Sequence, residues 1–200
     1  RGAENLRTIV QSGADENIDW LTVFAFSSEN WRRPEHEIKG LMQLIIRFIE
    51  TKSDELLESN VRVRIIGRRD RFSDELCTVL NNIEQQSSVN TGLNLTVALD
   101  YGGRQDITTA LKRIAEEIEV GMITASDIND DFLKSRMYTK ILPPVDLLIR
   151  TGGEKRLSNF LLWDLSYAEL FFSDKLWPDF TATDFYEALA SYGGRQRRFG

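Results

Sequence analysis

Short apolar runs alternate along the chain with longer stretches in which apolar residues recur at helical spacing. The short runs predict strands at residues 21–26, 61–66, 93–99, 145–149, 160–163 and 169–172. The longer stretches predict helices that begin near residues 1, 35, 74 and 106 and a last helix at 181–190, with an irregular acidic stretch after residue 120. Strands that alternate with helices favour a mostly parallel central β-sheet flanked by helices, an α/β fold. Composition does not change along the chain, so we expect residues 1–200 to form a single domain.

The predicted helix after Pro34 is apolar around much of its circumference. Its main apolar stripe follows the 3.6-residue period, whereas Leu44 and Ile46 fall outside that stripe. A helix that only covers a sheet needs one apolar stripe. Two interpretations stay open: burial on two sides or in a subunit contact, and a helix that lines an apolar cavity.

Composition excludes several function classes. The 200 residues are 42% hydrophobic and 28% charged, which is typical of a globular domain. A single cysteine, Cys77, and a single histidine, His36, exclude an internal disulfide, a multi-thiolate zinc site and a two-histidine metal site. One cysteine also suits a reducing compartment, so we expect a cytoplasmic protein. The net charge of −6 argues against a nucleic-acid-binding protein, and no apolar stretch reaches the roughly 18 residues of a transmembrane segment.

Arginines follow four of the predicted strands. The carboxyl ends of parallel strands form the ligand crevice of an open sheet, so these arginines are expected to gather at one edge. Guanidinium groups donate paired hydrogen bonds to phosphate oxygens, which predicts a phosphate or diphosphate ligand. We assign Arg33, Arg150 and Arg156 to that ligand because they lie beside serine, asparagine and glycine. The three arginines within residues 68–71 are expected instead to pair with surface carboxylates.

The glycine-rich motifs of nucleotide binding are absent from the sequence. There is no Gly-x-x-x-x-Gly-Lys-Ser/Thr phosphate loop, and no Gly-x-Gly-x-x-Gly motif follows the first strand. No serine or cysteine has the sequence setting of a nucleophile elbow. Diphosphate chemistry without a nucleotide, beside an apolar helix, indicates a lipid diphosphate.

Three longer segments carry a more specific pattern. They are residues 24–31 with Arg33 and Pro34, residues 94–104, and residues 146–169, which include Arg-Thr-Gly-Gly-Glu-Lys-Arg-Leu-Ser-Asn-Phe at 150–160. These segments resemble the cis-prenyltransferase family, most closely its bacterial undecaprenyl diphosphate synthases, and residues 195–200 look like the family's C-terminus.

The resemblance implies a fold with an apolar tunnel and a Mg2+-dependent enzyme. Such an enzyme condenses isopentenyl diphosphate units onto an allylic diphosphate, farnesyl diphosphate, with cis double bonds. The product is a long-chain polyprenyl diphosphate, in bacteria the undecaprenyl carrier lipid of cell-wall assembly. The resemblance also implies a homodimer that contacts the membrane transiently when product is released.

Site residues carried over from the resemblance have four roles: catalysis, metal binding, substrate binding and formation of the tunnel wall. Asn30 is expected near the carbon that loses a proton, as a positioning group because a carboxamide is a poor base. Glu169 is expected to help hold Mg2+, reaching into the neighbouring subunit's site. The isopentenyl diphosphate is expected at Arg150, Arg156 and Ser158, and the allylic diphosphate at Ser27, Trp31 and Arg33. Ser28, Glu29 and Leu157 are also expected to bind substrate, and the tunnel wall is expected at Ala25, Leu41, Leu44 and Leu93.

One family motif does not occur in the 200 residues. The family's Met-Asp-Gly-Asn-Gly-Arg segment, which holds the main Mg2+ ligand, lies upstream of the region that resembles this chain. We therefore expect the natural N-terminus to lie before Arg1. A non-catalytic partner subunit of a heteromeric cis-prenyltransferase is the alternative, and the upstream sequence decides between the two. A nucleotide- or RNA-binding module is disfavoured by the acidic net charge.

Overall fold

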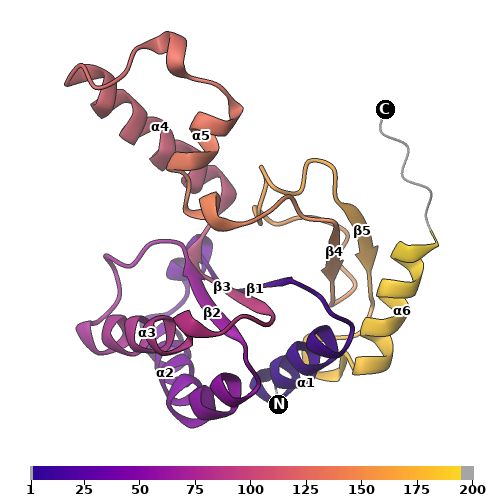
Figure 1. Ribbon diagram of the computed structural model, residues 1–200. Helices are drawn as coiled ribbons and strands as arrows, with labels where there is room; N and C mark the ends of the chain where they lie inside the picture. The colour runs from indigo at the N-terminus through magenta and orange to yellow at the C-terminus, as the bar shows by residue number, and fades with distance from the viewer. Residues whose placement is uncertain (1, 195–200) are drawn as a thin grey trace.

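The computed structural model describes residues 2–194, and residues 195–200 lie outside the described residues. Helices and strands alternate over most of this range (Figure 1). In chain order the elements are α1 (Gly2–Asp15), β1 (Trp20–Ser27), α2 (Glu35–Glu58), β2 (Arg62–Ile66), α3 (Asp74–Gln86), β3 (Asn94–Tyr101), α4 (Gly103–Glu119), α5 (Asp130–Arg136), β4 (Leu147–Arg150), β5 (Glu169–Phe172) and α6 (Ala182–Gly193). A 3₁₀ turn, η1 (Ser28–Arg32), connects β1 to the loop before α2.

Every strand pair in the described chain is parallel, as the sequence predicts, but the strands form two sheets. β3 lies between β1 and β2, and β4 pairs with β5. Within residues 2–194, β1 and β4 each have a hydrogen-bonded neighbour on one side. The expected strand at 160–163 is wrong: these residues form turns. Ser158, Asn159 and Leu161 have φ angles of 49°, 62° and 41°, which are incompatible with extended backbone.

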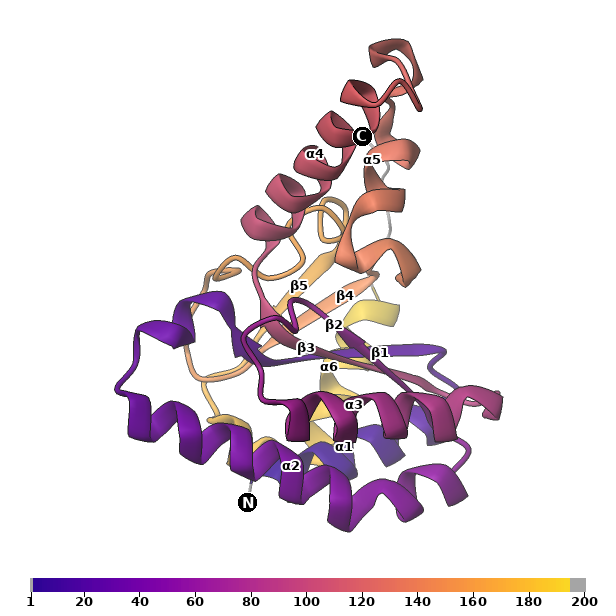
Figure 2. The ribbon, with the colours of Figure 1, turned by 90° about the vertical axis from the view of Figure 1, so that its left-hand side faces the viewer.

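The three-stranded sheet lies between two different layers. Figure 2 shows α1, α2 and α3 on the same side of this sheet. Alternate residues such as Val63 and Leu95 pack toward these helices, whereas Ile66 and Ala98 pack against residues 138–168. This two-residue alternation follows from the pleat of a β-strand. The strands are therefore buried on both faces, which explains why they are continuous apolar runs in the sequence.

Side-chain caps determine where two of the helices begin. The Ser73 hydroxyl accepts a hydrogen bond from the Leu76 amide (3.3 Å) at the start of α3. At α6, the Thr181 hydroxyl accepts from the Asp184 amide (3.4 Å), and the Asp184 carboxylate accepts from the Thr181 amide (2.8 Å). These reciprocal contacts form a capping box, which satisfies amide groups that have no partner inside the helix.

An arm made of α4 and α5 projects from the body of the molecule (Figures 1 and 2). α5 lies in the stretch expected to be irregular, so that expectation is wrong. Its start is capped by Asn129, whose side-chain oxygen accepts from the Phe132 amide (2.9 Å). A bidentate ion pair between Arg136 and Glu117 joins α5 to α4. A helix of seven residues is too short to show clear apolar periodicity, which explains why the pattern does not reveal it.

Candidate active site

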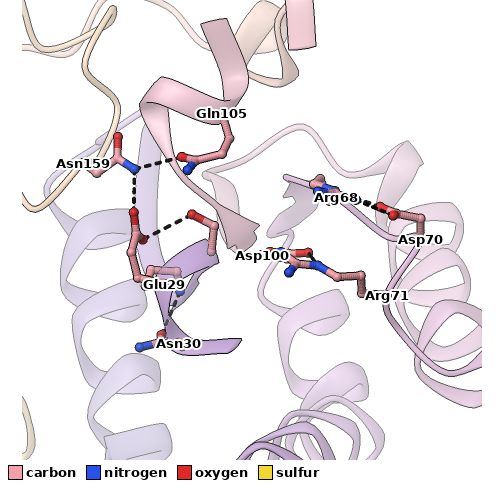
Figure 3. Close-up of polar contacts among 10 residues, drawn as sticks. Glu29, Asn30, Arg68, Asp70, Arg71, Asp100, Gln105 and Asn159 are labelled. Carbon is pink, nitrogen blue, oxygen red and sulfur yellow. Dashed lines mark hydrogen bonds and ion pairs between the residues drawn. The ribbon is translucent and has the colours of Figure 1, made fainter. Parts of the chain in front are cut away.

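The turn after β1 places Asn30 at the carboxyl end of the three-stranded sheet. The Ser27 amide donates to Asn30 Oδ1 (2.9 Å), which closes η1 onto the end of the strand (Figure 3). This hydrogen bond orients the carboxamide and leaves the amide nitrogen of Asn30 as a hydrogen-bond donor for a ligand. A carboxamide nitrogen donates hydrogen bonds and cannot take a proton at neutral pH. The geometry therefore fits a positioning group.

Glu29 connects η1 to the loop after β4. Its carboxylate accepts from Asn159 Nδ2 (2.8 Å) and from the Ser28 hydroxyl (3.2 Å), and Asn159 Nδ2 also donates to Gln105 Oε1 (2.9 Å) (Figure 3). Partial burial raises the pKa of Glu29, but the hydrogen bonds from Asn159, the backbone and the serines outweigh it and hold the pKa below its usual value. Glu29 is thus an anion that joins two loops. Sequence reasoning did not single out Asn159 or Gln105, because their contacts span 130 and 54 residues.

Gly102 lies close against this network. A Cβ atom on Gly102 would lie 2.5 Å from the Ser28 hydroxyl oxygen and 2.7 Å from Asn159 Nδ2. Both distances are shorter than the contacts that real Cβ atoms make, so a side chain at Gly102 would displace these side-chain ends and disturb the network. The absence of a side chain at Gly102 therefore leaves room for the hydrogen bonds between Glu29, Gln105 and Asn159.

The loop after β4 brings together three residues predicted to bind diphosphate. Arg150 Nη1 donates to the Ser158 hydroxyl (2.7 Å) and to the Arg156 carbonyl oxygen. The Arg156 guanidinium forms an ion pair with Glu154, and both of these side chains are more than half exposed. Leu157 packs against the core between them. The loop therefore presents two guanidinium groups and a hydroxyl at one place.

The two glycines of this loop serve the fold. Gly152 and Gly153 have φ angles of 91° and 76°, a region that favours glycine. Their amides donate to the carbonyl oxygens of Lys175 (2.7 Å) and Ser173 (3.0 Å). These amides are not available to a phosphate, so anion binding at this loop depends on the side chains.

The remaining arginines near the strand ends differ in their partners. Arg68 pairs with the exposed Asp70 and Arg69 pairs with Glu84, as expected for carboxylate partners. The partner of Arg71 is Asp100, whose side chain is fully buried, so the expectation of a surface carboxylate is wrong there. Within residues 2–194, Arg33 is exposed and forms no ion pair, which leaves its guanidinium available to a ligand.

Glu169 lies apart from the Arg150 loop. It is the first residue of β5 and pairs with Leu147, whereas Arg150 pairs with Phe172 at the other end of the two strands. Three residue steps separate these ends, about 10 Å along the strands. The part of the chain that the structure describes contains no group of three acidic, histidine or cysteine side chains that could hold a metal ion.

An apolar cavity of about 1170 Å³ reaches from the Arg150 loop down along the sheet. It runs beside the edges of β1 and β4 and between the sheet and α2. Ala25 and Leu44 line it and are exposed to it, and Arg150, Arg156 and Ser158 stand at its polar end. The further apolar lining on α2 and the sheet includes Leu41, Ile45, Phe48, Ile49, Val23, Ile65, Val97 and Leu99. Leu93 is outside this lining and is buried in the core with Val10 and Val61.

The cavity explains why α2 is apolar around much of its circumference. Ile46, which falls outside the main stripe, is buried with Leu76 and Leu80 of α3. Leu44 instead faces the cavity and is 56% exposed. α2 is therefore buried on a second side at Ile46 and lines the cavity at Leu44, so features of both interpretations are present, and the tunnel itself stays a prediction. No helix among residues 2–194 is long and apolar enough to cross a bilayer.

Comparison with known proteins identifies the family. The prenyltransferase family model, described as undecaprenyl diphosphate synthase, matches residues 1–200. The ditrans,polycis-undecaprenyl-diphosphate synthase of Haemophilus ducreyi, named as specific for (2E,6E)-farnesyl diphosphate, is 47% identical over 199 residues, covering all of this chain and 82% of the relative. The enzyme of the same name from Escherichia coli K12 is 44% identical over 199 residues, covering 79% of the relative.

Two solved structures have the same fold over the whole chain. Lavandulyl diphosphate synthase from Lavandula x intermedia, solved in complex with dimethylallyl diphosphate, has a TM-score of 0.96 and 36% identity, and 86% of its chain is covered. A probable undecaprenyl diphosphate synthase from Campylobacter jejuni has a TM-score of 0.86 and 33% identity, with 91% of its chain covered. The chain belongs to the undecaprenyl diphosphate synthase family of prenyltransferases.

Proposed function

We propose that the protein condenses isopentenyl diphosphate units onto farnesyl diphosphate, with cis double bonds, to make undecaprenyl diphosphate. The observation that carries this proposal is an apolar cavity of about 1170 Å³ with Arg150, Arg156 and Ser158 at its polar end. Guanidinium and hydroxyl groups bind diphosphate oxygens, and an apolar cavity takes the hydrocarbon. The family membership supports the same reaction.

The residues at the cavity mouth account for binding and charge stabilisation. In each cycle the allylic carbon–oxygen bond breaks and diphosphate leaves, while the π electrons of isopentenyl diphosphate form the new carbon–carbon bond. Arg33 stabilises the departing charge, and Arg150, Arg156 and Ser158 hold the diphosphate of isopentenyl diphosphate. The loss of one proton then forms the new double bond. Asn30 orients the reacting groups, and diphosphate or water takes the proton.

The hydrocarbon side of the reaction depends on the cavity. Each new isoprene unit adds five carbons, whose burial contributes at most about 4 kcal/mol at 0.8 kcal/mol per CH2. Ligand pockets commonly measure about 300–1,000 Å³, and this cavity is larger. Its size favours a product much longer than a five-carbon group such as dimethylallyl. Ala25, Leu41 and Leu44 form part of the wall along which the chain grows.

The cofactor, assembly and compartment follow from the same proposal. We propose Mg2+ as the cofactor, with Glu169 as one carboxylate ligand, and a homodimer in the cytoplasm. The position of Glu169 away from the Arg150 loop is consistent with a role in a neighbouring subunit's site.

The test is an incorporation assay on the complete protein. The protein is incubated with radiolabelled isopentenyl diphosphate, farnesyl diphosphate and Mg2+, and the extracted polyprenols are sized. The proposal predicts a ladder that ends at a long-chain product. No incorporation, or a product extended by one unit only, would contradict it. Incorporation that requires a second, different subunit would support the non-catalytic partner alternative.

A further inference from the structure

Arg71 lies where three separate segments meet at the carboxyl end of the sheet. Its Nε donates to Asp100 Oδ2 (2.8 Å) at the end of β3, and its Nη2 contacts the other carboxylate oxygen (Figure 3). The central carbon of this guanidinium group lies 4.7 Å from the ring centroid of Trp31 in η1. One side chain thus connects the loop after β2, the end of β3 and η1.

The Asp100 carboxylate holds the guanidinium in a single orientation. The Asp100 side chain is fully buried and that of Arg71 is 34% exposed. A buried carboxylate needs its charged partner, and a bidentate pair fixes the plane of the guanidinium as well as its position. The plane that faces Trp31 is therefore determined by Asp100.

The loop that carries Arg71 is itself seated on β3. Gly67 has a φ of 115°, and a Cβ atom there would lie 1.9 Å from the Leu99 carbonyl oxygen. The Arg68 amide donates to the Asp100 carbonyl oxygen (3.3 Å). This close approach of two backbones holds the loop that carries Arg71 against the end of β3.

Trp31 has few other polar restraints. Its ring lies edge-on to Phe26 at 5.4 Å and stacks on Phe72 at 6.2 Å. Its Nε1 is buried and has no hydrogen-bond partner among the described residues. The ring is therefore held by packing and by the cation–π contact with Arg71. Trp31 follows Asn30 directly in η1, so the position of one affects the other.

We propose that Arg71 is a positioning residue for η1: fixed by Asp100, it holds Trp31 and so keeps Asn30 and the allylic-diphosphate side of the site in place. The proposal rests on the proposed function for its kinetic consequences. The structural part of the proposal, that Arg71 keeps η1 ordered, does not depend on that function. Lysine cannot replace arginine here, since it keeps the charge but lacks the planar, bidentate group.

The kinetic test compares R71K with R68K. Arg68 is the matched control, because it lies in the same loop and pairs with the exposed Asp70. We expect R71K to lower kcat/KM for farnesyl diphosphate by about threefold to thirtyfold, the range of a cation–π contact. The KM for isopentenyl diphosphate should change less than about twofold, and R68K should match wild type. R71K kinetics equal to those of R68K would overturn the proposal.

A double-mutant cycle with W31L separates positioning from direct contact with substrate. If Arg71 acts through Trp31, R71K should have little further effect in the W31L background. An undiminished effect there would mean that Arg71 contacts substrate itself, which overturns a positioning role.

Hydrogen exchange of the unliganded protein gives a readout that needs no activity. Amides of residues 27–33 should exchange faster in R71K than in R68K or wild type, while those of 150–159 should not change. Equal exchange at 27–33 in all three proteins would overturn the proposal. If the wild-type enzyme elongates no prenyl chain, the proposed function fails, and this exchange measurement alone decides the role of Arg71.

Discussion

The cavity predicts that an A25L substitution shortens the product. Ala25 lies on β1, lines the cavity and is exposed to it, so the larger side chain enters empty space. Leucine has three more carbon atoms than alanine, so it takes up cavity space that about three carbon atoms of the growing chain would otherwise fill. At about 0.8 kcal/mol per carbon, the last unit loses about 2.4 kcal/mol of burial, or roughly fiftyfold in its occupancy. The main product should therefore lose at least one isoprene unit.

The assay measures the chain-length distribution of dephosphorylated products by liquid chromatography and mass spectrometry. A115L is the matched control, because Ala115 is an exposed residue of α4 and does not line the cavity. It should give the wild-type distribution. The thermal stability of A25L should stay close to that of wild type, since the cavity accommodates the new side chain. Wild-type chain lengths from A25L would refute the assignment of this cavity to the product.

Three other substitutions test separate parts of the structure. R150A should lower kcat/KM for isopentenyl diphosphate by about 10- to 100-fold, which corresponds to the loss of a charge-assisted hydrogen bond. K155A in the same loop should have little effect, and equal kinetics for the two variants would show that Arg150 is not part of the site. K134M leaves the buried Asp164 without its ion pair and should lower the free energy of unfolding, measured in urea, by about 3–5 kcal/mol. K112M, at an exposed lysine, should cause almost no change, and a loss below about 1 kcal/mol in K134M would contradict this prediction. D184N tests the α6 cap, in which hydrogen bonds from Lys175 and Thr181 lower the pKa of Asp184 to about 2. The contribution of Asp184 to the free energy of unfolding is therefore present above its ordinary pKa near 4 and is lost as the pH falls toward 2. In D184N the free energy of unfolding should fall less steeply over that pH window. Parallel pH profiles for D184N and wild type would count against this reading of the cap.

The strands of the three-stranded sheet could be predicted from sequence because each is a continuous apolar run. The prediction for residues 21–26 falls within β1, and the one for 61–66 differs from β2 by one residue. The run at 160–163 misleads because the positive φ angles at Ser158, Asn159 and Leu161 have no signature in an apolar pattern. The division into two sheets was also missed, since the choice of neighbouring strand depends on tertiary contacts.

The arrangement of the candidate site was also predicted only in part, because a sequence pattern reveals local groupings of residues and not long-range contacts. Arginine at the end of an apolar run is a local pattern, and it locates the cluster of Arg150, Arg156 and Ser158. The contact of Arg71 with Asp100 spans 29 residues and depends on the buried end of β3, which no local pattern encodes. Leu93 precedes β3 and is buried in the core outside the cavity lining, a difference that its apolar character does not reveal.

The proposed reaction requires the apolar cavity to hold the hydrocarbon of the growing lipid. Photo-crosslinking of the complete protein with a benzophenone-bearing farnesyl diphosphate analogue, followed by peptide mass spectrometry, tests it most directly. We expect labels on β1 and on the cavity side of α2, at or near Ala25 and Leu44, and we expect unlabelled farnesyl diphosphate to suppress them. Labels confined to the α4–α5 arm, or labels that the competitor does not reduce, would contradict it.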